Sequence, residues 1–248
     1  MNDEEMILKR LKELYNRAYN KGYYTYSTFL GLNGQSVLAS FASANMVTLF
    51  GGTGGTERVV AAFGDKEMYG YEPVFPIKCI RISPKGPKFA ENLSHRDFLG
   101  SILSLGIERE QVGDIIIKDG GAHVFVLDNM AAYITDNLDR IRHTPVRCEL
   151  TEDNIPDIYS EAKELVVQIP SERVDVLVSK VYHLSRNDVT SLIKGKKIYI
   201  DGVLCNKDGA RIKNGNVISV RGYGRIWYGE VMQTTKKGNL CVKVSAAV

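Results

Sequence analysis

Apolar residues near the start of the chain recur every three or four positions, the spacing of one face of a helix. They are Ile7, Leu11, Leu14 and Ala18. A second helix-like stretch covers residues 35–42, and two β-rich apolar runs follow at 46–50 and 58–63. The glycine-rich segment 51–56 joins those two runs, as the turn of a hairpin would. We therefore predict a small α/β domain over residues 1–74.

Strand and helix patterns then alternate with short connections. They are a strand at 77–82, a helix at 94–105, strands at 114–117 and 123–127 around a turn at Gly120-Gly121, a helix at 130–141 and a strand at 145–150. This order predicts the split βαβ layout of ferredoxin-like folds, which RNA-recognition motifs share, over residues 75–151. Such motifs stack bases on aromatic residues of the sheet. Here Phe125 is the only aromatic residue of the central strand pair, so this is a candidate RNA-binding domain whose contact with RNA the pattern does not establish.

The last third of the chain has its own organisation. Residues 152–170 indicate a connector with some strand character, and a separate domain is predicted over 171–248. The spacing of valines and leucine predicts a helix over 173–183. Ser185 is a good N-cap for a second helix, and Asp188 favours its N-terminus. The apolar positions of that second helix are Val189, Leu192 and Ile193.

The pattern changes to alternation after these two helices. Residues 197–200 predict a strand, Asp201-Gly202 a tight turn, and residues 217–221 a closing strand. The predicted C-terminal domain is thus a pair of crossed helices with a small sheet. Over the whole chain the predicted fold class is α+β, with several domains.

Charge is unevenly distributed along the chain. The 248 residues carry a formal net charge of +3. Residues 171–248 hold 14 Lys and Arg against 6 Asp and Glu, whereas residues 1–170 hold 18 against 23. A basic domain beside an acidic body is the electrostatic pattern expected of a nucleic-acid-binding protein, so phosphate contacts are expected at the C-terminal end.

Arg186 and Asn187 lie in the first turn of the second predicted helix, where backbone amides also attract phosphate. Other basic residues flank that helix or lie on the loops of the sheet, and clustered cations gain affinity by releasing counterions from RNA. The predicted RNA-binding residues are Arg173, Ser185, Arg186, Asn187, Lys194, Lys196, Lys197, Lys207, Arg211, Arg221 and Arg225. Asp175 is predicted to be structural, as the partner of a nearby basic side chain or as a cap. Trp227 could pack the domain or stack on a base.

Residues 172–225 resemble an S4-type RNA-binding domain, also called the alpha-L motif. The motifs that carry the resemblance are Arg173-Val174-Asp175, Leu184-Ser185-Arg186, Ile193-Lys194-Gly195, Ile200-Asp201-Gly202, Asn214-Gly215-Asn216-Val217-Ile218 and Arg221-Gly222-Tyr223-Gly224-Arg225. The chain departs from the usual pattern at Val174, where leucine is usual. It departs again at Asp201, where asparagine is frequent, and at Asn216, where aspartate is usual.

With upstream motifs added, essentially the whole chain resembles the YlmH family of bacterial proteins. Those motifs are Phe50-Gly51-Gly52, Glu57-Arg58, His95 to Leu103, Gly106-Ile107 and Gly113-Asp114-Ile115. The resemblance implies a non-enzymatic, cytoplasmic RNA-binding protein that associates with the large ribosomal subunit. It also implies a link to rescue of stalled nascent-chain complexes and to cell division. The S4 domain would contact ribosomal RNA and peptidyl-tRNA.

Two alternatives stay open at this point. One is an RNA-modifying enzyme with an S4 guide domain, although the catalytic segment of a pseudouridine synthase and the glycine pattern of a methyltransferase are missing from the sequence. The other is a cell-division scaffold with incidental RNA affinity. The segment 51–56 lacks the ending of a P-loop, and His95-Arg96-Asp97 lacks the other kinase motifs. Ser94 is instead predicted to cap a helix that begins with those three residues.

The sequence predicts no catalytic residue, cofactor or metal site. Its four cysteines are far apart and form no Cys-x-x-Cys pair, which is typical of reduced core cysteines. No apolar run approaches the ~18 residues of a membrane span. The first five residues lack the order of a secretory signal. We therefore expect a cytoplasmic protein without membrane insertion that is a monomer when free of the ribosome.

Overall fold

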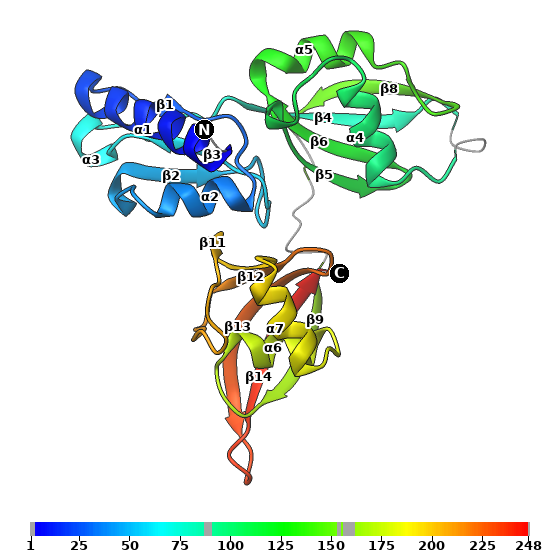
Figure 1. Cartoon of the computed structure of the whole chain (residues 1–248). Helices are drawn as coiled ribbons and strands as arrows, with labels where there is room; N and C mark the ends of the chain where they lie inside the picture. Colours follow the sequence, from blue (N-terminus) through cyan, green and yellow to red (C-terminus); the bar gives the residue numbers. More distant parts are fainter. Residues whose placement is uncertain (1–2, 87–90, 153–154, 156–161, 248) are drawn as a thin grey trace. The chain divides into compact units, whose positions relative to one another are not determined.

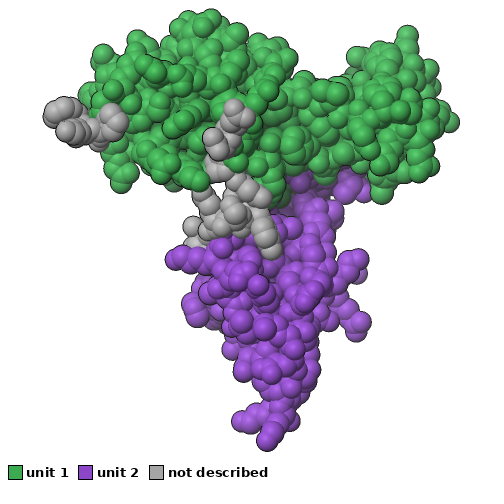
Figure 2. All heavy atoms as spheres, turned by 180° about the vertical axis from the view of Figure 1, so that it is seen from behind, with its two compact units in different colours: residues 1–34, 40–158 green, residues 35–39, 159–248 purple. Residues whose placement is uncertain are grey.

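The computed structural model describes residues 3–86, 91–152, 155 and 162–247. The chain divides into two compact units, residues 1–34 with 40–158 and residues 35–39 with 159–248 (Figure 2). The fold is α+β, as predicted, and the described residues form three antiparallel sheets. The finer division into domains at residues 74, 151 and 170 stays a prediction.

The N-terminal part of the first unit contains a three-stranded sheet of order β1-β3-β2 (Figure 1). Its elements are α1 (Asp3–Lys21), β1 (Thr25–Tyr26), α2 (Leu32–Ala39), the 3-10 helix η1 (Ala44–Met46), β2 (Val47–Phe50), β3 (Val60–Phe63) and α3 (Lys66–Tyr69). Leu11 and Ala18 are buried, which confirms the predicted apolar face of α1. Strands β2 and β3 pair antiparallel, so the glycine-rich segment 51–56 does lie in a hairpin connection.

The rest of the first unit is a five-stranded sheet of order β5-β6-β4-β8-β7 with α4 and α5 on one face. The elements are β4 (Ile77–Pro84), α4 (His95–Leu103), η3 (Arg109–Gln111), β5 (Val112–Lys118), β6 (Gly121–Leu127), α5 (Asp128–Asn137), β7 (Arg140–Ile141) and β8 (Thr144–Thr151). Strand β4 lies between β6 and β8, with all neighbours antiparallel, which is the arrangement that a split βαβ layout requires.

Two local predictions in this sheet need correction. The helix predicted over 130–141 ends at Asn137, because Leu138 adopts an extended conformation with φ of −93° and ψ of 94°. Arg142, with a positive φ of 52°, lies in the hairpin turn between β7 and β8. The spacing between Ile134 and Ile141 fits one face of a helix, but the buried Ile141 belongs to strand β7. The turn between β5 and β6 lies at Asp119 and Gly120, one residue earlier than predicted, with φ of 51° and 73°. Two positive φ values are those of a type I′ hairpin turn.

The second unit is built on a six-stranded sheet of order β11-β10-β12-β13-β14-β9, packed against two helices (Figure 1). The elements are β9 (Lys163–Ile169), α6 (Val174–Val181), α7 (Arg186–Lys194), β10 (Ile198–Ile200), β11 (Val203–Leu204), β12 (Val217–Val220), β13 (Gly224–Thr234) and β14 (Leu240–Ala247). The core lies between the helices and one face of the sheet. It includes Leu177, Val178, Leu192, Ile218 and Val244.

The sheet of the second unit is larger than the sequence predicted. Residues 163–169 of the predicted connector form β9, which pairs with β14 from Ile169 opposite Leu240 to Lys163 opposite Ala246. The predicted closing strand, β12, is an interior strand, because β13, β14 and β9 continue the sheet beyond it. The Asp201-Gly202 turn is confirmed: the two residues have φ of 49° and 76° and connect β10 to β11.

Candidate nucleic-acid interface

Helix α7 begins as its sequence predicts. The amide of Asp188 donates to Oγ of Ser185 at 3.2 Å, and the amide of Ser185 donates to Oδ2 of Asp188 at 3.1 Å. These reciprocal bonds form a capping box, which fixes the first turn. Val189, Leu192 and Ile193 are buried on the other side of the helix. Arg186 and Asn187 are exposed in the first turn as a result.

Four basic residues surround the C-terminal end of the same helix. They are Lys194, Lys196, Lys197 and Arg221, all exposed, and we call them the α7 C-terminal cluster. The amide of Lys197 donates to the carbonyl of Leu192 at 2.9 Å, and the amide of Arg221 donates to the carbonyl of Lys197 at 2.9 Å. The Arg221 guanidinium lies 5.1 Å from the centre of the Tyr199 ring, which limits where it can point.

The two ends of α7 therefore both carry exposed cations. A helix of nine residues is about 13 Å long. Arg186 at one end and the α7 C-terminal cluster at the other are thus held at a fixed separation by one short, capped helix. A rigid spacing of this kind suits contacts to several phosphates of a folded RNA.

The remaining predicted residues are more varied. Arg173 forms a two-pronged ion pair with Asp175, with distances of 3.0 and 2.8 Å, and this hydrogen bonding raises the pKa of Arg173. Asp175 therefore has the structural role predicted for it, and RNA would have to compete with it for Arg173. Arg211 is exposed and lies opposite Arg173 in an isolated β-bridge.

Lys207 and Arg225 lie apart from α7 in the chain. Lys207 is exposed on the loop after β11. Arg225 is half-buried on β13, and its Nε donates to Oγ of Ser219 at 3.2 Å. Trp227, two residues further along β13, lines a surface hollow of about 480 Å³ together with Asn214, Met232 and Ser245. Packing and base stacking both stay predictions for this residue.

Two departures from the S4 pattern meet in the structure. Nδ2 of Asn216 donates to Oδ2 of Asp201 at 2.5 Å, and the amide of Val217 donates to Oδ1 of Asp201 at 2.7 Å. Asn216 also accepts from the amide of Lys213 at 2.8 Å. The usual asparagine and aspartate are thus present with their positions exchanged, and sequence reasoning treated them as separate changes.

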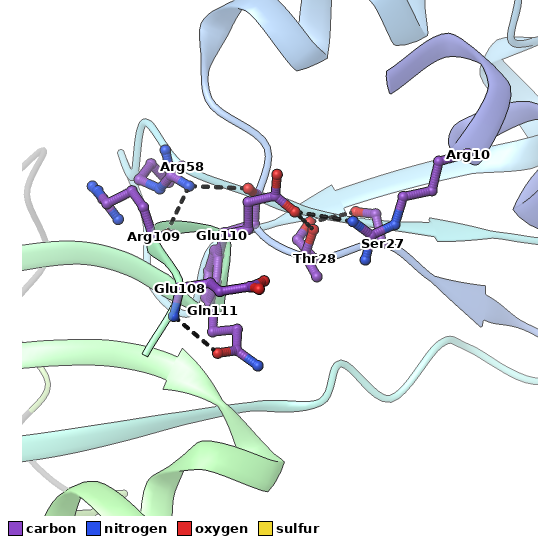
Figure 3. A network of polar contacts seen from close by, with 9 residues as sticks. Arg10, Ser27, Thr28, Arg58, Glu108, Arg109, Glu110 and Gln111 are labelled. Carbon is purple, nitrogen blue, oxygen red and sulfur yellow. Dashed lines mark hydrogen bonds and ion pairs between the residues drawn. The ribbon is translucent and has the colours of Figure 1, made fainter. Parts of the chain in front are cut away.

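In the first unit, the upstream motif residues form a joint between the two sheets (Figure 3). The Arg58 guanidinium donates to the carbonyls of Val112 at 2.9 Å, Phe29 at 3.1 Å and Arg109 at 3.2 Å. Burial, and then the nearby charge of Arg109, lower the pKa of Arg58 to about 10, so it stays charged at neutral pH. The amides of Glu57 and Arg58 donate to the carboxylate of Asp114.

A second set of bonds reinforces this joint. Glu110 accepts from Arg10 at 3.0 Å and from Thr28 at 3.2 Å (Figure 3). Every donor comes from the N-terminal part of the unit, and the acceptor lies in the segment that leads into β5. His95, close to Arg109 and Asp114, begins α4 after the predicted N-cap Ser94, and burial lowers its pKa.

Comparison with known proteins gives these motifs a context. A family model described as "Putative RNA-binding domain in YlmH" matches residues 73–157. A curated protein of Bacillus subtilis (strain 168), named ribosome-associated protein quality control protein P2, is 24% identical over 149 residues, which cover 59% of this chain and 57% of that protein. Residues 73–157 of this chain are thus similar to the RNA-binding domain model of YlmH proteins. The match with the Bacillus subtilis protein spans little more than half of the length of that protein.

A solved structure agrees with the fold of part of the chain. The structure named cell division protein ylmH from Streptococcus pneumoniae aligns with a TM-score of 0.50 and 21% identity, over 63% of this chain and 96% of that chain. At this identity the likeness concerns the fold alone. The family model ends at residue 157, so all the predicted RNA-binding residues, from Arg173 to Arg225, lie outside the segment it matches.

The described residues hold no group of three or more His, Cys, Asp or Glu side chains that could bind a metal ion. Cys79, Cys205 and Cys241 are buried and Cys148 is half-buried, all as free thiols. Burial raises the pKa of the Cys79 and Cys148 thiols to about 11. Among the helices that the structure describes, none has the length and apolar character needed to cross a bilayer.

Proposed function

We propose that this chain is a non-catalytic RNA-binding protein that associates with the large ribosomal subunit and acts in rescue of stalled translation. In this proposal the second unit is an S4-type domain that contacts ribosomal RNA and peptidyl-tRNA. The observation that carries the proposal is α7, a capped helix with exposed cations at both ends. The name of the Bacillus subtilis relative, ribosome-associated protein quality control protein P2, supports the association with the ribosome.

The proposal assigns phosphate contacts to Arg186 and to the α7 C-terminal cluster. Among the described residues, the side chains of Arg186 and Lys194 have no hydrogen bond or ion pair that would have to break first. Each phosphate neutralised makes log K fall with log salt by about 0.7 to 0.9. Two contacts therefore account for a loss of about 7- to 12-fold in affinity between 50 and 200 mM salt.

The test is co-sedimentation of the full chain with large ribosomal subunits across a salt series. The variant Arg186→Ala with Lys194→Ala is expected to bind more weakly at low salt and to show a slope smaller by about 1.4 to 1.8. The matched control is Lys236→Ala with Lys237→Ala, which removes two exposed charges from the β13–β14 connection of the same unit. Equal slopes for the two variants would reject the assignment to α7.

The division-scaffold alternative gives a different result in cells. If RNA contact were incidental, the Arg186→Ala and Lys194→Ala variant would lose subunit binding and still localise to the septum. If the ribosome recruits the protein, the same variant would lose both properties. Localisation of a fluorescent fusion, compared with the Lys236→Ala and Lys237→Ala control, separates these outcomes.

A further inference from the structure

The five-stranded sheet has one face covered by α4 and α5 and one face without helices, which we call the open face. Side chains alternate between the two faces of a strand. Ile80 and Ile82 of β4 pack with α4 and α5, so Cys79, Arg81 and Ser83 belong to the open face. In sheet folds that bind single-stranded RNA, aromatic side chains on such a face stack on the bases.

The aromatic residue at the centre of this face is already covered. Phe125, on β6 opposite Cys79, is 1% exposed and packs in a cluster with Phe29 and Val60 of the N-terminal part. A Cβ atom on Gly52 would lie 2.2 Å from Cδ1 of Phe125. The hairpin connection between β2 and β3 therefore lies directly on the phenyl ring.

The covering segment is fixed in place. Gly113 allows the same close approach from the other side, since a Cβ there would lie 2.7 Å from the Phe29 ring. The bonds from Arg58 to the Asp114 carboxylate and to the Val112 carbonyl connect the covering residues to β5. No base can stack on Phe125 while these contacts hold.

Outside the covered cluster, the open face carries exposed basic side chains. Strand register places four cations on it: Lys118 of β5, Arg81 of β4, Arg147 of β8 and Arg140 of β7. All four are exposed. The five strands contribute one carboxylate to this exposed region, Glu149, which lies opposite Arg81 and pairs with Arg147 at 3.4 Å. The other strand carboxylate, Asp114, belongs to the joint.

These residues are close enough to act together. Neighbouring strands are about 4.8 Å apart, so Lys118 on β5 and Arg147 on β8 are separated by about 14 Å across the sheet. Arg81 and Arg147 are diagonal neighbours, about 7 to 8 Å apart at the backbone. The exposed rows thus form a small flat surface with four positive charges and one negative charge.

We propose that this surface, formed by Arg81, Lys118, Arg140 and Arg147, binds the phosphate backbone of RNA without reading its bases. The inference rests on the proposed RNA-binding function and assigns a second contact surface to it, in the segment that the family model matches. Charge complementarity supports RNA as the occupant. The covered Phe125 supports contacts to phosphate instead of base stacking.

The first test compares the full chain with the variant Arg81→Ala plus Arg147→Ala on two ligands of equal length, an oligouridine and an abasic sugar-phosphate strand. Two lost phosphate contacts on a single strand reduce the salt slope by about 1.4, which is a 7-fold difference between 50 and 200 mM salt. We expect this reduction on both ligands. The matched control, Lys9→Ala plus Arg17→Ala, removes two exposed charges from α1 and should change the slope by much less.

Glu149→Gln is expected to strengthen RNA binding, a result that a loss of folding would not produce. It removes the carboxylate that pairs with Arg147, so about one more phosphate contact becomes available; affinity rises, and the gain is about 2- to 3-fold larger at 50 mM than at 200 mM salt. An unchanged slope for the double variant, or no gain for Glu149→Gln, would overturn the proposal. So would a loss that appears on oligouridine and is missing on the abasic strand, because bases would then be read.

All measurements are repeated in the Arg186→Ala plus Lys194→Ala background. If only the α7 changes weaken binding, the proposed function stands and the open-face surface fails. If only the open-face changes weaken binding, the open-face surface stands and the assignment of phosphate contacts to α7 fails. Independent reductions that add together support both surfaces.

Discussion

The side chains of Asp201 and Asn216 form a hydrogen bond between two loops of the second unit. Each residue stands where the S4 pattern usually has the other, so swapping the two residues tests whether the hydrogen bond stabilises these loops. Asn216 is 8% exposed and uses its amide to donate to Asp201 while accepting from Lys213. Asp201 in turn accepts from the amide of Val217. The pair therefore connects the turn after β10 to the loop that leads into β12.

Each single change breaks this arrangement in a different way. Asn216→Asp places two carboxylates in contact, and losing a hydrogen bond to a charged group costs about 1.5–3 kcal/mol. Asp201→Asn leaves two amide donors facing each other. We expect the free energy of opening this region to fall by about 2.5 kcal/mol in the first variant and about 1.5 kcal/mol in the second. The double exchange restores one donor and one carboxylate, so it should cost about 1 kcal/mol or less.

Hydrogen exchange of the full chain, followed by mass spectrometry, measures this opening in peptides that cover residues 197–204 and 213–220. A loss of about 2.5 kcal/mol corresponds to exchange about 60-fold faster. Asn214→Asp is the matched control, since it adds the same charge at an exposed position two residues away, and should stay within about twofold. The reasoning is refuted if the double exchange opens as readily as Asn216→Asp alone.

Three further outcomes follow from the first unit. Gly52→Ala, at φ of 106° and with no room for a methyl group, should lower the free energy of unfolding by more than about 2 kcal/mol, whereas Gly22→Ala, with open space around it, should cost about half as much in the same denaturant titration. Arg58→Met, which removes three hydrogen bonds from the guanidinium to backbone carbonyls, should cost about 3 kcal/mol. The pKa of His95 is lowered by burial, so its stabilising contribution is complete above its unfolded pKa and is lost as pH falls through the folded value; His95→Gln should therefore flatten the fall in stability between pH 7 and pH 5.

Local chemistry in the sequence predicted several elements well. The capping box of α7 needs only Ser185 and Asp188 at the right spacing, and the sequence alone predicts that both favour the start of this helix. The Asp201-Gly202 turn and the Ser94 cap are similarly local. These features are determined by residues within one turn of each other, so a sequence pattern contains the information.

Contacts between distant segments were not predictable in the same way. Strand β9 pairs with β14, about 70 residues later, and nothing in the local pattern of either strand specifies the partner. The Asp201 and Asn216 contact spans 15 positions and joins two residues that each looked like an isolated exception. A pairwise comparison of exceptions, Asp for Asn at one position and Asn for Asp at another, was the signal that could have revealed it.

The upstream motifs show how a chemical pattern can have a packing role. Gly51-Gly52, Arg58 and Gly113-Asp114 belong to the motifs that carry the resemblance to the YlmH family, and a glycine-rich segment can suggest phosphate binding. In the structure Gly52 and Gly113 allow close approach to Phe125 and Phe29, and Arg58 donates to backbone carbonyls. These residues hold the N-terminal part against the sheet, so they determine which part of the open face RNA could reach.

The summed charge of a segment likewise does not show whether one of its surfaces is basic. Residues 1–170 hold 18 basic and 23 acidic residues, and this acidic sum favours phosphate contacts in the C-terminal unit alone. The open face of the first unit is nevertheless basic, because strand register gathers Arg81, Lys118, Arg140 and Arg147 there with a single carboxylate. Phosphate groups respond to the charges within about one Debye length, about 8 to 10 Å, and not to the sum over a segment. A segment with a negative total can therefore still present a surface that binds RNA.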